Sequence, residues 1–254
     1  MIEHGTPDEV AATAGAYPDT GSLLEVTAVR AGYGDSTVLD GVSCHVSAGE
    51  FVALIGRNGV GKSTLMKAVT GRLPVRSGSV TWKGVNLERW PSHRRVRNGM
   101  RWVDEDRGIF PNLTVGENLA VAGKPLPRSL AYSVDAIMDN FPKLRDKSPQ
   151  KAASLSGGEQ RMLALARAIA ARPELLMLDE FSEGLQPSIV QELIATLREA
   201  NRDGLGVLMV EQNVRLAVKY AERAYVMDKG QIVHEGTTQA LREDEALLQR
   251  YLVV

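Results

Sequence analysis

The chain of 254 residues contains one cysteine, Cys44, and four histidines. A single cysteine excludes an internal disulfide framework and a zinc site built from several thiolates. The histidines are scattered and lack the short spacing of metal ligands: His4, His45, His93 and His234. We therefore expect no metal site built on histidine or cysteine, and we interpret Cys44 as a small core residue.

The chain also has no marked excess of positive or negative charge and no long apolar run. Thirty basic residues face 31 acidic ones, for a formal net charge of −1. This balance does not indicate a nucleic-acid-binding surface. No apolar run approaches the ~20 residues that cross a bilayer. The amino terminus has no basic start followed by an apolar stretch, so we expect no signal peptide.

The first third of the chain predicts strands after an irregular start. Residues 1–22 have no apolar period, and we interpret them as a flexible leader. Alternating apolar residues over 23–29 predict an edge strand, and 38–46 and 79–83 predict two more. The continuous apolar run 51–55 is typical of a strand buried on both faces. Antiparallel strands are therefore mixed with one core strand in this region.

The rest of the chain predicts helices and then an α/β pattern. Helical spacing over 115–122 and 129–140, stopping at Pro142, indicates a small helical lobe, which we place at about 106–165. Helices and strands then alternate over 157–171, 174–179, 187–202, 206–210, 213–222 and 224–228. This alternation predicts a parallel sheet. We expect residues 23–254 to form one α/β domain with the helical lobe inserted in it.

Residues 56–64, GRNGVGKST, fit the phosphate-binding pattern G-x-x-x-x-G-K-[ST]. A predicted strand precedes the pattern and a helix can follow it, as the pattern requires. Glycines let the backbone curl around an anion, and the start of a helix favours negative charge. The residues expected to bind nucleotide here are Gly56, Asn58, Gly59, Gly61, Lys62, Ser63 and Thr64. The alternative interpretation is an ordinary glycine-rich turn with a chance Lys-Ser pair.

Two carboxylates follow another apolar strand, at Asp179 and Glu180. Parallel sheets place ligands at the carboxyl ends of their strands. There Asp179 can support Mg²⁺, and Glu180 can orient or deprotonate a water molecule. The alternative is that both acids merely cap the next helix.

The segment LSGGEQ at 155–160 precedes a strongly predicted helix. Ser156 and Glu159 have the spacing of a capping box, so an ordinary helix start is one interpretation. Two adjacent glycines disfavour a helix, however, and are better explained if the backbone must approach another group closely. A second anion-binding helix start is the other interpretation.

These motifs resemble those of ATP-binding-cassette (ABC) ATPases. In order, the chain shows Tyr33 between two glycines, the phosphate loop, LSGGEQ, the Asp179–Glu180 pair, the segment 182–187 and VEQN at 210–213. The resemblance covers residues 23–254. It implies a P-loop ATPase with a RecA-like parallel core sheet, an N-terminal antiparallel β subdomain and an inserted helical subdomain.

The resemblance also implies roles for individual residues. Tyr33 would stack on adenine, unless it is simply a surface aromatic in a glycine turn. Ser63, Glu105 and Asp179 would hold Mg²⁺, and Glu180 would be the base, with Lys62 and Gln212 contacting phosphate. A second ATPase subunit, identical or a sister, would pack head to tail against this one. Across the interface, Ser156 and Gly158 of the signature would contact the γ-phosphate, and Gly157 and Glu159 would also bind the nucleotide.

The segments 103–119 and 210–213 resemble one ATPase subunit of importers for branched-chain amino acids and for urea or short amides. This implies permease subunits in the membrane, an indirect link to a solute-binding protein and a peripheral place on the cytoplasmic face of the membrane. We expect residues 110–118 to contact the permease, unless Phe110 and Leu113 are core residues of the lobe. Asp104, Gly108 and Phe181 depart from the usual pattern of this group.

Three other functions compete with import. A soluble ABC ATPase acting on ribosomes or DNA would usually carry two cassettes or long coiled coils, whereas this chain shows one of each motif and no sustained heptads. A small-molecule kinase is disfavoured by LSGGEQ. An exporter ATPase would use the same chemistry, and only the resemblance at 103–119 and 210–213 favours import.

Overall fold

The computed structural model describes residues 21–104, 108–122, 134–244, 246 and 249. The expected leader up to residue 20, Glu105 and the first part of the helix expected at 129–140 lie outside the described residues. The domain limits of 23–254 and of the helical lobe at 106–165 stay predictions.

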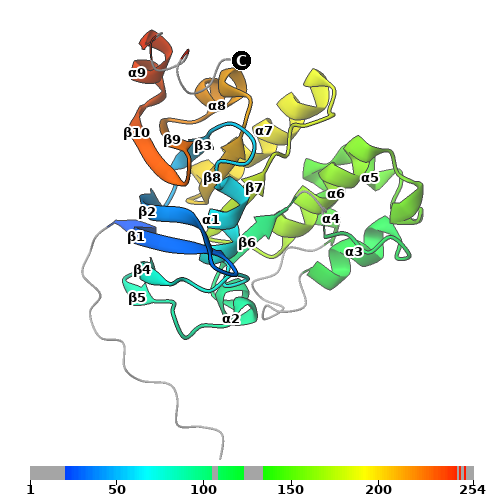
Figure 1. Cartoon of the computed structure of the whole chain (residues 1–254). Helices are drawn as coiled ribbons and strands as arrows, with labels where there is room; N and C mark the ends of the chain where they lie inside the picture. The colour runs from blue at the N-terminus through cyan, green and yellow to red at the C-terminus, as the bar shows by residue number, and fades with distance from the viewer. Residues whose placement is uncertain (1–20, 105–107, 123–133, 245, 247–248, 250–254) are drawn as a thin grey trace, which may run out of the picture.

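A six-stranded sheet forms the centre of the molecule (Figure 1), with the strand order β10-β9-β3-β8-β7-β6. Its members are β3 (Phe51–Ile55), β6 (Met100–Val103), β7 (Leu175–Asp179), β8 (Gly206–Glu211), β9 (Arg223–Asp228) and β10 (Gln231–Thr237). All neighbours from β9 to β6 run parallel, and β10 pairs antiparallel with β9. Every residue of β3, β7 and β8 is buried, as their continuous apolar runs predict. The expected parallel core sheet is confirmed.

A second, antiparallel sheet has the order β2-β1-β4-β5. Its strands are β1 (Ser22–Tyr33), β2 (Ser36–Ser47), β4 (Ser77–Trp82) and β5 (Val85–Asn86). The prediction of an edge strand at 23–29 was wrong, because β1 pairs with β2 on one side and β4 on the other. Alternating apolar residues show that one face of a sheet is buried and the other is not. Edge strands and interior strands of such a sheet both have this pattern, so it does not distinguish them.

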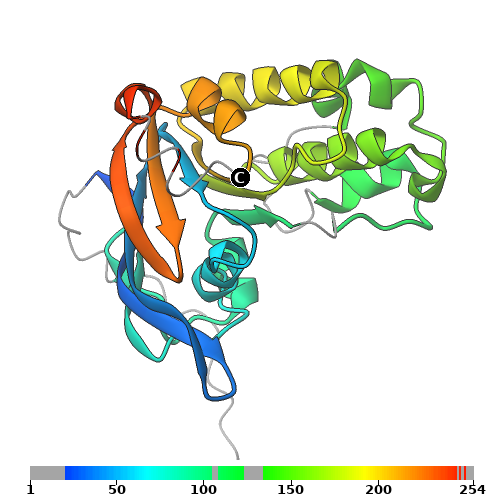
Figure 2. The same cartoon turned by 45° about the horizontal axis from the view of Figure 1, so that its top comes forward.

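Helices cover the central sheet and extend beyond it. They are α1 (Lys62–Val69), α2 (Ser92–Arg97), α3 (Val115–Ala122), α4 (Val134–Asn140), α5 (Pro142–Arg145), α6 (Gly157–Ala170), α7 (Pro187–Arg202), α8 (Val214–Tyr220) and α9 (Thr238–Glu243), with a 3₁₀ turn at Ala152–Ser154. Figure 2 shows α3 to α5 on the side of the molecule away from β1 and β2. Pro142 opens α5, where its missing N–H is no loss. Among the described residues, no helix is both long and apolar enough to cross a bilayer.

Alternate residues of β3 point into two different cores. Phe51 and Ala53 pack in the cluster that contains α6 and α7, whereas Val52 and Leu54 join the cluster of α1 and the antiparallel sheet. The central sheet is therefore covered by packed apolar side chains on both faces. Cys44 is buried in the second cluster, as expected.

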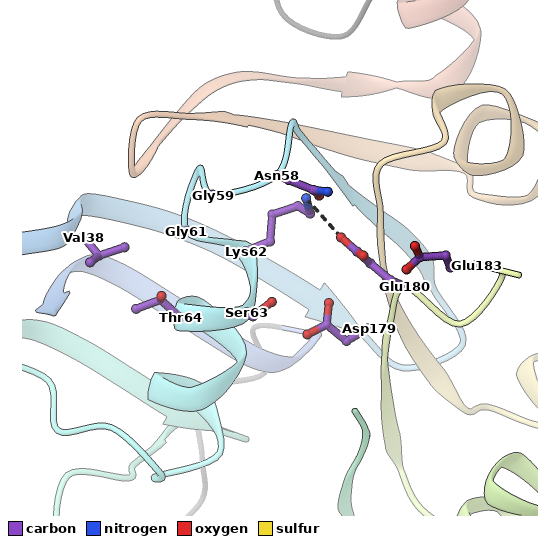
Figure 3. A pocket seen from close by; sticks show the side chains of 10 residues that line it. All are labelled: Val38, Asn58, Gly59, Gly61, Lys62, Ser63, Thr64, Asp179, Glu180 and Glu183. Atoms are coloured by element: carbon purple, nitrogen blue, oxygen red, sulfur yellow. Dashed lines mark ion pairs between the residues drawn. The ribbon is translucent and has the colours of Figure 1, made fainter. Parts of the chain in front are cut away.

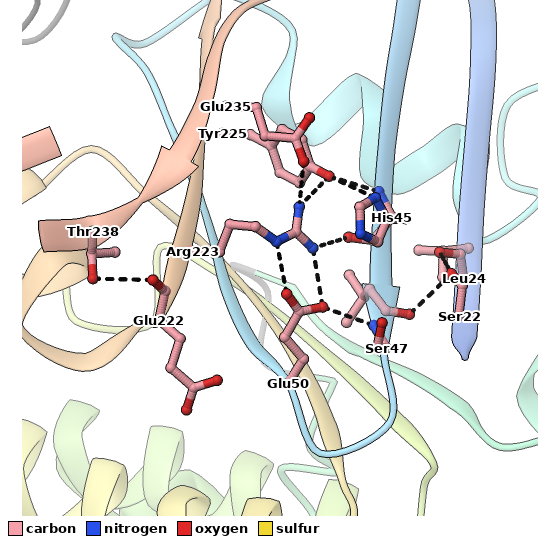
Figure 4. Close-up of polar contacts among 11 residues, drawn as sticks. Ser22, Leu24, His45, Ser47, Glu50, Glu222, Arg223, Tyr225, Glu235 and Thr238 are labelled. Carbon is pink, nitrogen blue, oxygen red and sulfur yellow. Dashed lines mark hydrogen bonds and ion pairs between the residues drawn. The ribbon is translucent and has the colours of Figure 1, made fainter. Parts of the chain in front are cut away.

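A polar network joins the two sheets at the amino ends of β3 and β9 (Figure 4). The Arg223 guanidinium donates to both Glu50 oxygens, with Nε–Oε1 at 2.7 Å and Nη2–Oε2 at 3.0 Å, and to the His45 carbonyl at 2.9 Å. It also bonds to the Tyr225 hydroxyl and, at 2.8 Å, to Glu235. Since His45 belongs to β2, the bond from Arg223 to the His45 carbonyl fixes the antiparallel sheet against the central one, and the bidentate pair with Glu50 holds Arg223 in place.

Candidate active site

The phosphate loop runs from the end of β3 to the start of α1. Gly59 and Gly61 have φ of 79° and 114°, in the left-handed region that glycine adopts without strain. A Cβ on Gly56 would lie 2.5 Å from the Met227 carbonyl oxygen, so this position also requires glycine. Within the described chain no side chain caps α1. The N–H groups of its first turn are therefore available to an anion.

Lys62 lies folded over this loop and is almost fully buried, with 4% of its side chain exposed. Its Nζ donates to the carbonyl oxygens of Gly56 at 2.8 Å and Arg57 at 3.1 Å. The same ammonium forms an ion pair with Glu180 Oε1 at 3.5 Å. Figure 3 marks this pair with a dashed line. The loop carbonyls thus hold the cation above the curled backbone, where it can meet a phosphate.

Glu180 occupies a strained backbone position at the end of β7. Its φ of 45° lies in the left-handed region, which costs a non-glycine residue about 1 kcal/mol or more. Its N–H donates to the Val210 carbonyl at 2.9 Å. Arg161 Nη1 donates to the carbonyl oxygens of Glu180 at 2.9 Å and Phe181 at 2.7 Å. Contacts from β8 and α6 therefore hold the strain in place.

These residues line one pocket of about 390 Å³ (Figure 3). Its lining residues are Val38, Asn58, Gly59, Gly61, Lys62, Ser63, Thr64, Asp179, Glu180 and Glu183. The structure thus brings together two sequence motifs that lie more than a hundred residues apart. Sequence reasoning missed Val38 and Glu183, which belong to no phosphate-binding pattern.

The pocket offers oxygen ligands of the kind that Mg²⁺ prefers. The Ser63 hydroxyl and the Asp179 carboxylate lie on neighbouring walls of the pocket (Figure 3). A hydroxyl and a carboxylate beside a phosphate-binding loop are a suitable donor set for this ion. The residues present therefore fit the expected metal; Glu105 lies outside the described residues.

A second pocket of about 400 Å³ adjoins the first and contains Gln212. Glu180 and Glu183 line both pockets. Behind Gln212, Glu211 is buried at the end of β8 and accepts hydrogen bonds from Ser182. Burial raises the pKa of Glu211 to about 7, while the bonds from Ser182 oppose that rise and the nearby Glu180 charge adds to it. Sequence reasoning assigned Glu211 no role, although a carboxylate ending an apolar strand was a visible signal.

The signature segment begins α6 as a capped helix. Ser156 N donates to Glu159 Oε2 at 2.9 Å, and Glu159 N donates to Ser156 Oγ at 3.4 Å. Lys147, 2.6 Å from Glu159, lowers the pKa of that carboxyl by hydrogen bonding. A Cβ on Gly158 would lie 2.9 Å from Ile189 Cδ1, so close packing on α7 explains one of the two glycines.

In the described part of the chain, Ser156, Gly157 and Gly158 line neither pocket. Ser156 and Gly157 are exposed to solvent. Tyr33 is also outside the first pocket's lining; 47% of it is exposed, and Lys67 Nζ lies 5.6 Å from its ring centroid. The roles of all four residues toward nucleotide stay predictions.

Comparison with known proteins identifies this architecture. A family model described as "ABC transporter" matches residues 39–183, which include the phosphate loop, the signature and the Asp179–Glu180 pair. The chain belongs to the ABC transporter family. It is an ATP-binding subunit and an ATP-hydrolysing enzyme of that family.

Several ABC proteins match it over nearly their whole length. The branched-chain amino acid transport ATP-binding protein BraG of Pseudomonas aeruginosa is 40% identical, over 91% of this chain and 99% of BraG. The lipopolysaccharide export ATP-binding protein LptB of Haemophilus influenzae is 33% identical, over 91% and 97%. A solved structure of an ATP-binding subunit of an ABC transporter is 27% identical, with a TM-score of 0.78, over 91% and 96%. The fold and family predicted from the motifs are confirmed.

Proposed function

We propose that this ABC ATPase powers the import of branched-chain amino acids or related small amides. The observation that carries the ATPase part is the single pocket that unites Lys62, Ser63, Asp179 and Glu180. The 40% identity to BraG across 91% of the chain supports import rather than export. The order Glu211, Gln212, Asn213 at the end of β8, which resembles the amino-acid importers, supports the same choice.

In this proposal the phosphate loop binds the triphosphate of ATP. The backbone N–H groups of the loop and of the first turn of α1 surround the phosphates, and Lys62 adds a positive charge. Ser63 and Asp179 hold Mg²⁺, which when bound neutralises charge on the phosphate oxygens. Glu180 orients the attacking water and accepts its proton. Because little covalent chemistry is required, placement and charge do most of the catalysis.

A second ATPase subunit completes the site. The signature residues Ser156 and Gly157 are exposed and lie outside the nucleotide pocket of their own chain, so they are available to a neighbour's γ-phosphate. A helix start presents backbone N–H groups to an anion. Head-to-tail packing would therefore give two composite sites, and nucleotide would favour the closed pair.

The tip of the helical lobe is the part that we propose meets the permease, on the cytoplasmic face of the membrane. Phe110 is 44% exposed, which argues against a core role for it. The buried Asn118 holds this tip: its Nδ2 donates to the carbonyls of Phe110 at 3.0 Å and Thr114 at 2.9 Å. Its Oδ1 accepts from Phe110 N at 2.9 Å. A fixed loop with an exposed aromatic ring is suited to partner binding.

Reconstitution tests the proposal. The chain would be placed in proteoliposomes with permease subunits encoded beside it, and ATP hydrolysis would be measured with and without the cognate binding protein loaded with leucine. We expect leucine or a small amide to stimulate hydrolysis, and Glu180→Gln to abolish both hydrolysis and uptake. Permeases that extract lipid and ignore amino acids would show an exporter instead. Phosphate release without any added acceptor would separate an ATPase from a kinase.

A further inference from the structure

A buried carboxyl group ties the segment after Glu180 to the end of β8. Ser182 Oγ donates to Glu211 Oε2 at 3.1 Å, and Ser182 N donates to Glu211 Oε1 at 3.4 Å. Each carboxylate oxygen thus receives one donor from the same residue. Glu211 is 3% exposed, so water does not compete strongly for these bonds.

Two residues of the proposed chemistry, Glu180 and Gln212, lie next to the contact between Ser182 and Glu211. Glu180 is two residues before Ser182, and Gln212 directly follows Glu211. Both line the pocket of about 400 Å³. A contact between Ser182 and Glu211 therefore sets the distance between the Glu180 segment and the Gln212 segment.

We propose that Glu211 is a positioning residue of the ATPase, which holds Glu180 and Gln212 in register through Ser182. The inference rests on the proposed role of Glu180 as the base. The left-handed backbone of Glu180, with φ of 45°, needs continuous support from its neighbours. Glu211 supplies that support after Glu180, as Arg161 does through the Glu180 and Phe181 carbonyls.

Protonation of Glu211 removes its charge but can keep its contact with Ser182. An ionised carboxylate accepts both donors of Ser182, whereas a protonated one accepts from Ser182 N and donates to Ser182 Oγ. The charged groups that face Glu211 are Glu180, from the end of β7, and Arg161, from α6. Lys62 pairs with Glu180 on its other side. The pH dependence comes from the charge: an ionised Glu211 favours proton uptake by Glu180 through like-charge repulsion, and a neutral side chain at this position does not. Turnover should therefore rise with pH as Glu211 ionises, near pH 7.

Steady-state hydrolysis between pH 6 and pH 9 tests this in the full chain. We expect wild type to show an inflection in kcat near pH 7. In Glu211→Gln the amide can still accept from Ser182 N and donate to Ser182 Oγ, so turnover persists and the inflection disappears. Ser182→Ala loses one hydrogen bond and should lower kcat about tenfold; Glu211→Ala loses two and should lower kcat at least as much, with KM for ATP unchanged in both. The exposed Glu199→Gln is the matched control and should behave as wild type.

An inflection that persists in Glu211→Gln, or alanine variants with wild-type kcat, would overturn the proposal. Hydrogen exchange at residues 181–183 gives a second readout that does not depend on activity. It should be faster in Glu211→Ala and Ser182→Ala and unchanged in Glu211→Gln. Protected amides at 181–183 in both alanine variants would refute the positioning role. A wild-type chain that binds no ATP by calorimetry would instead defeat the proposed function, whatever the exchange data show.

Discussion

The charged residues at the two ends of the parallel strands differ in how fully they are paired. At the amino end, Arg223 and Glu50 form a bidentate pair with both atoms of the fork engaged, at 2.7 and 3.0 Å. Burial raises the pKa of Glu50, but hydrogen bonds from Arg223 and Ser47 outweigh it and leave that pKa below its usual value. Arg223 and Glu50 thus already have their partners, and the same arginine links the two sheets through the His45 carbonyl (Figure 4).

At the carboxyl end the charges are held but incompletely matched. Lys62 and Glu180 form an ion pair at 3.5 Å, longer than both contacts of the Arg223–Glu50 pair, and Glu180 has a strained backbone. The pKa of Glu211 is raised to about 7 by burial. Charged groups whose contacts are long or whose pKa is shifted are stabilised most by a new partner, such as a phosphate or a metal ion. The same sheet thus uses one end for stability and the other for chemistry, and five experiments test that division.

Replacing Glu180 should have the largest effect. Glu180→Gln removes the proton acceptor but keeps the size of the side chain, so kcat should fall by about 10²- to 10⁴-fold. ATP affinity should be retained, because the phosphate loop is untouched. Single-turnover hydrolysis and calorimetry check both parts. Steady-state turnover at the wild-type rate would show that another group accepts the proton.

Glu211→Gln should make the free energy of unfolding less dependent on pH. The folded-state pKa of Glu211 is raised from 4.5 to about 7, so wild type loses stability as pH rises through that interval. The loss can reach about 3 kcal/mol at ~1.4 kcal/mol per pKa unit. Glu211→Gln should therefore match wild type near pH 5 and exceed it at pH 8. Urea denaturation at the two pH values gives the comparison, and parallel shifts in both proteins would contradict it.

Lys62→Ala should weaken nucleotide binding itself. Loss of a charge-assisted contact to phosphate lowers affinity by roughly 10- to 100-fold. Calorimetry with MgATP measures this directly. A folded variant that keeps wild-type affinity would remove Lys62 from the binding site.

Glu50→Gln should destabilise the protein without touching catalysis. It leaves Arg223 with a weaker acceptor in a partly buried place, which should cost about 2 kcal/mol of unfolding free energy. Thermal denaturation measures the loss, and ATP affinity should stay at the wild-type value. A change in ATP affinity without a change in stability would break the contrast between the two ends.

Gln212→Ala should have the smallest effect on pH dependence. An amide does not titrate between pH 5 and pH 8, unlike an imidazole. The inflection in kcat should therefore remain in this variant, even if the rate falls. If Gln212→Ala removed the inflection while Glu211→Gln kept it, the assignment of the titrating group would be wrong.

Much of the pocket could be predicted because its parts are local motifs. The conformation of the phosphate loop is set by its own residues, because Gly59 and Gly61 permit the left-handed backbone. The strand before the loop and the helix after it follow from apolar runs. Asp179 was predictable as the last residue of an apolar strand. The two motifs share a pocket because β3 and β7 both pair with β8 in parallel, which the alternation of helices and strands already favoured.

Other features left no local signal. The position of β1 inside its sheet depends on which strands pair with it, here β2 and β4. Its alternating pattern fits an edge strand or an interior strand equally well. Glu183 lines the pocket although it belongs to no motif for phosphate. Arg161 reaches the Glu180 carbonyl from 19 residues earlier in the chain, through the packing of α6 on β7.

The amino-acid sequence by itself determined the family and the phosphate loop and predicted which residues would bind nucleotide, because all three depend on short-range backbone geometry and residue type. Tertiary structure alone decided which charges are satisfied. Arg223 meets Glu50 across 173 residues, and Glu211 meets Ser182 across 29. The strength of such contacts depends on burial and exact distance, and both arise only when distant segments pack together.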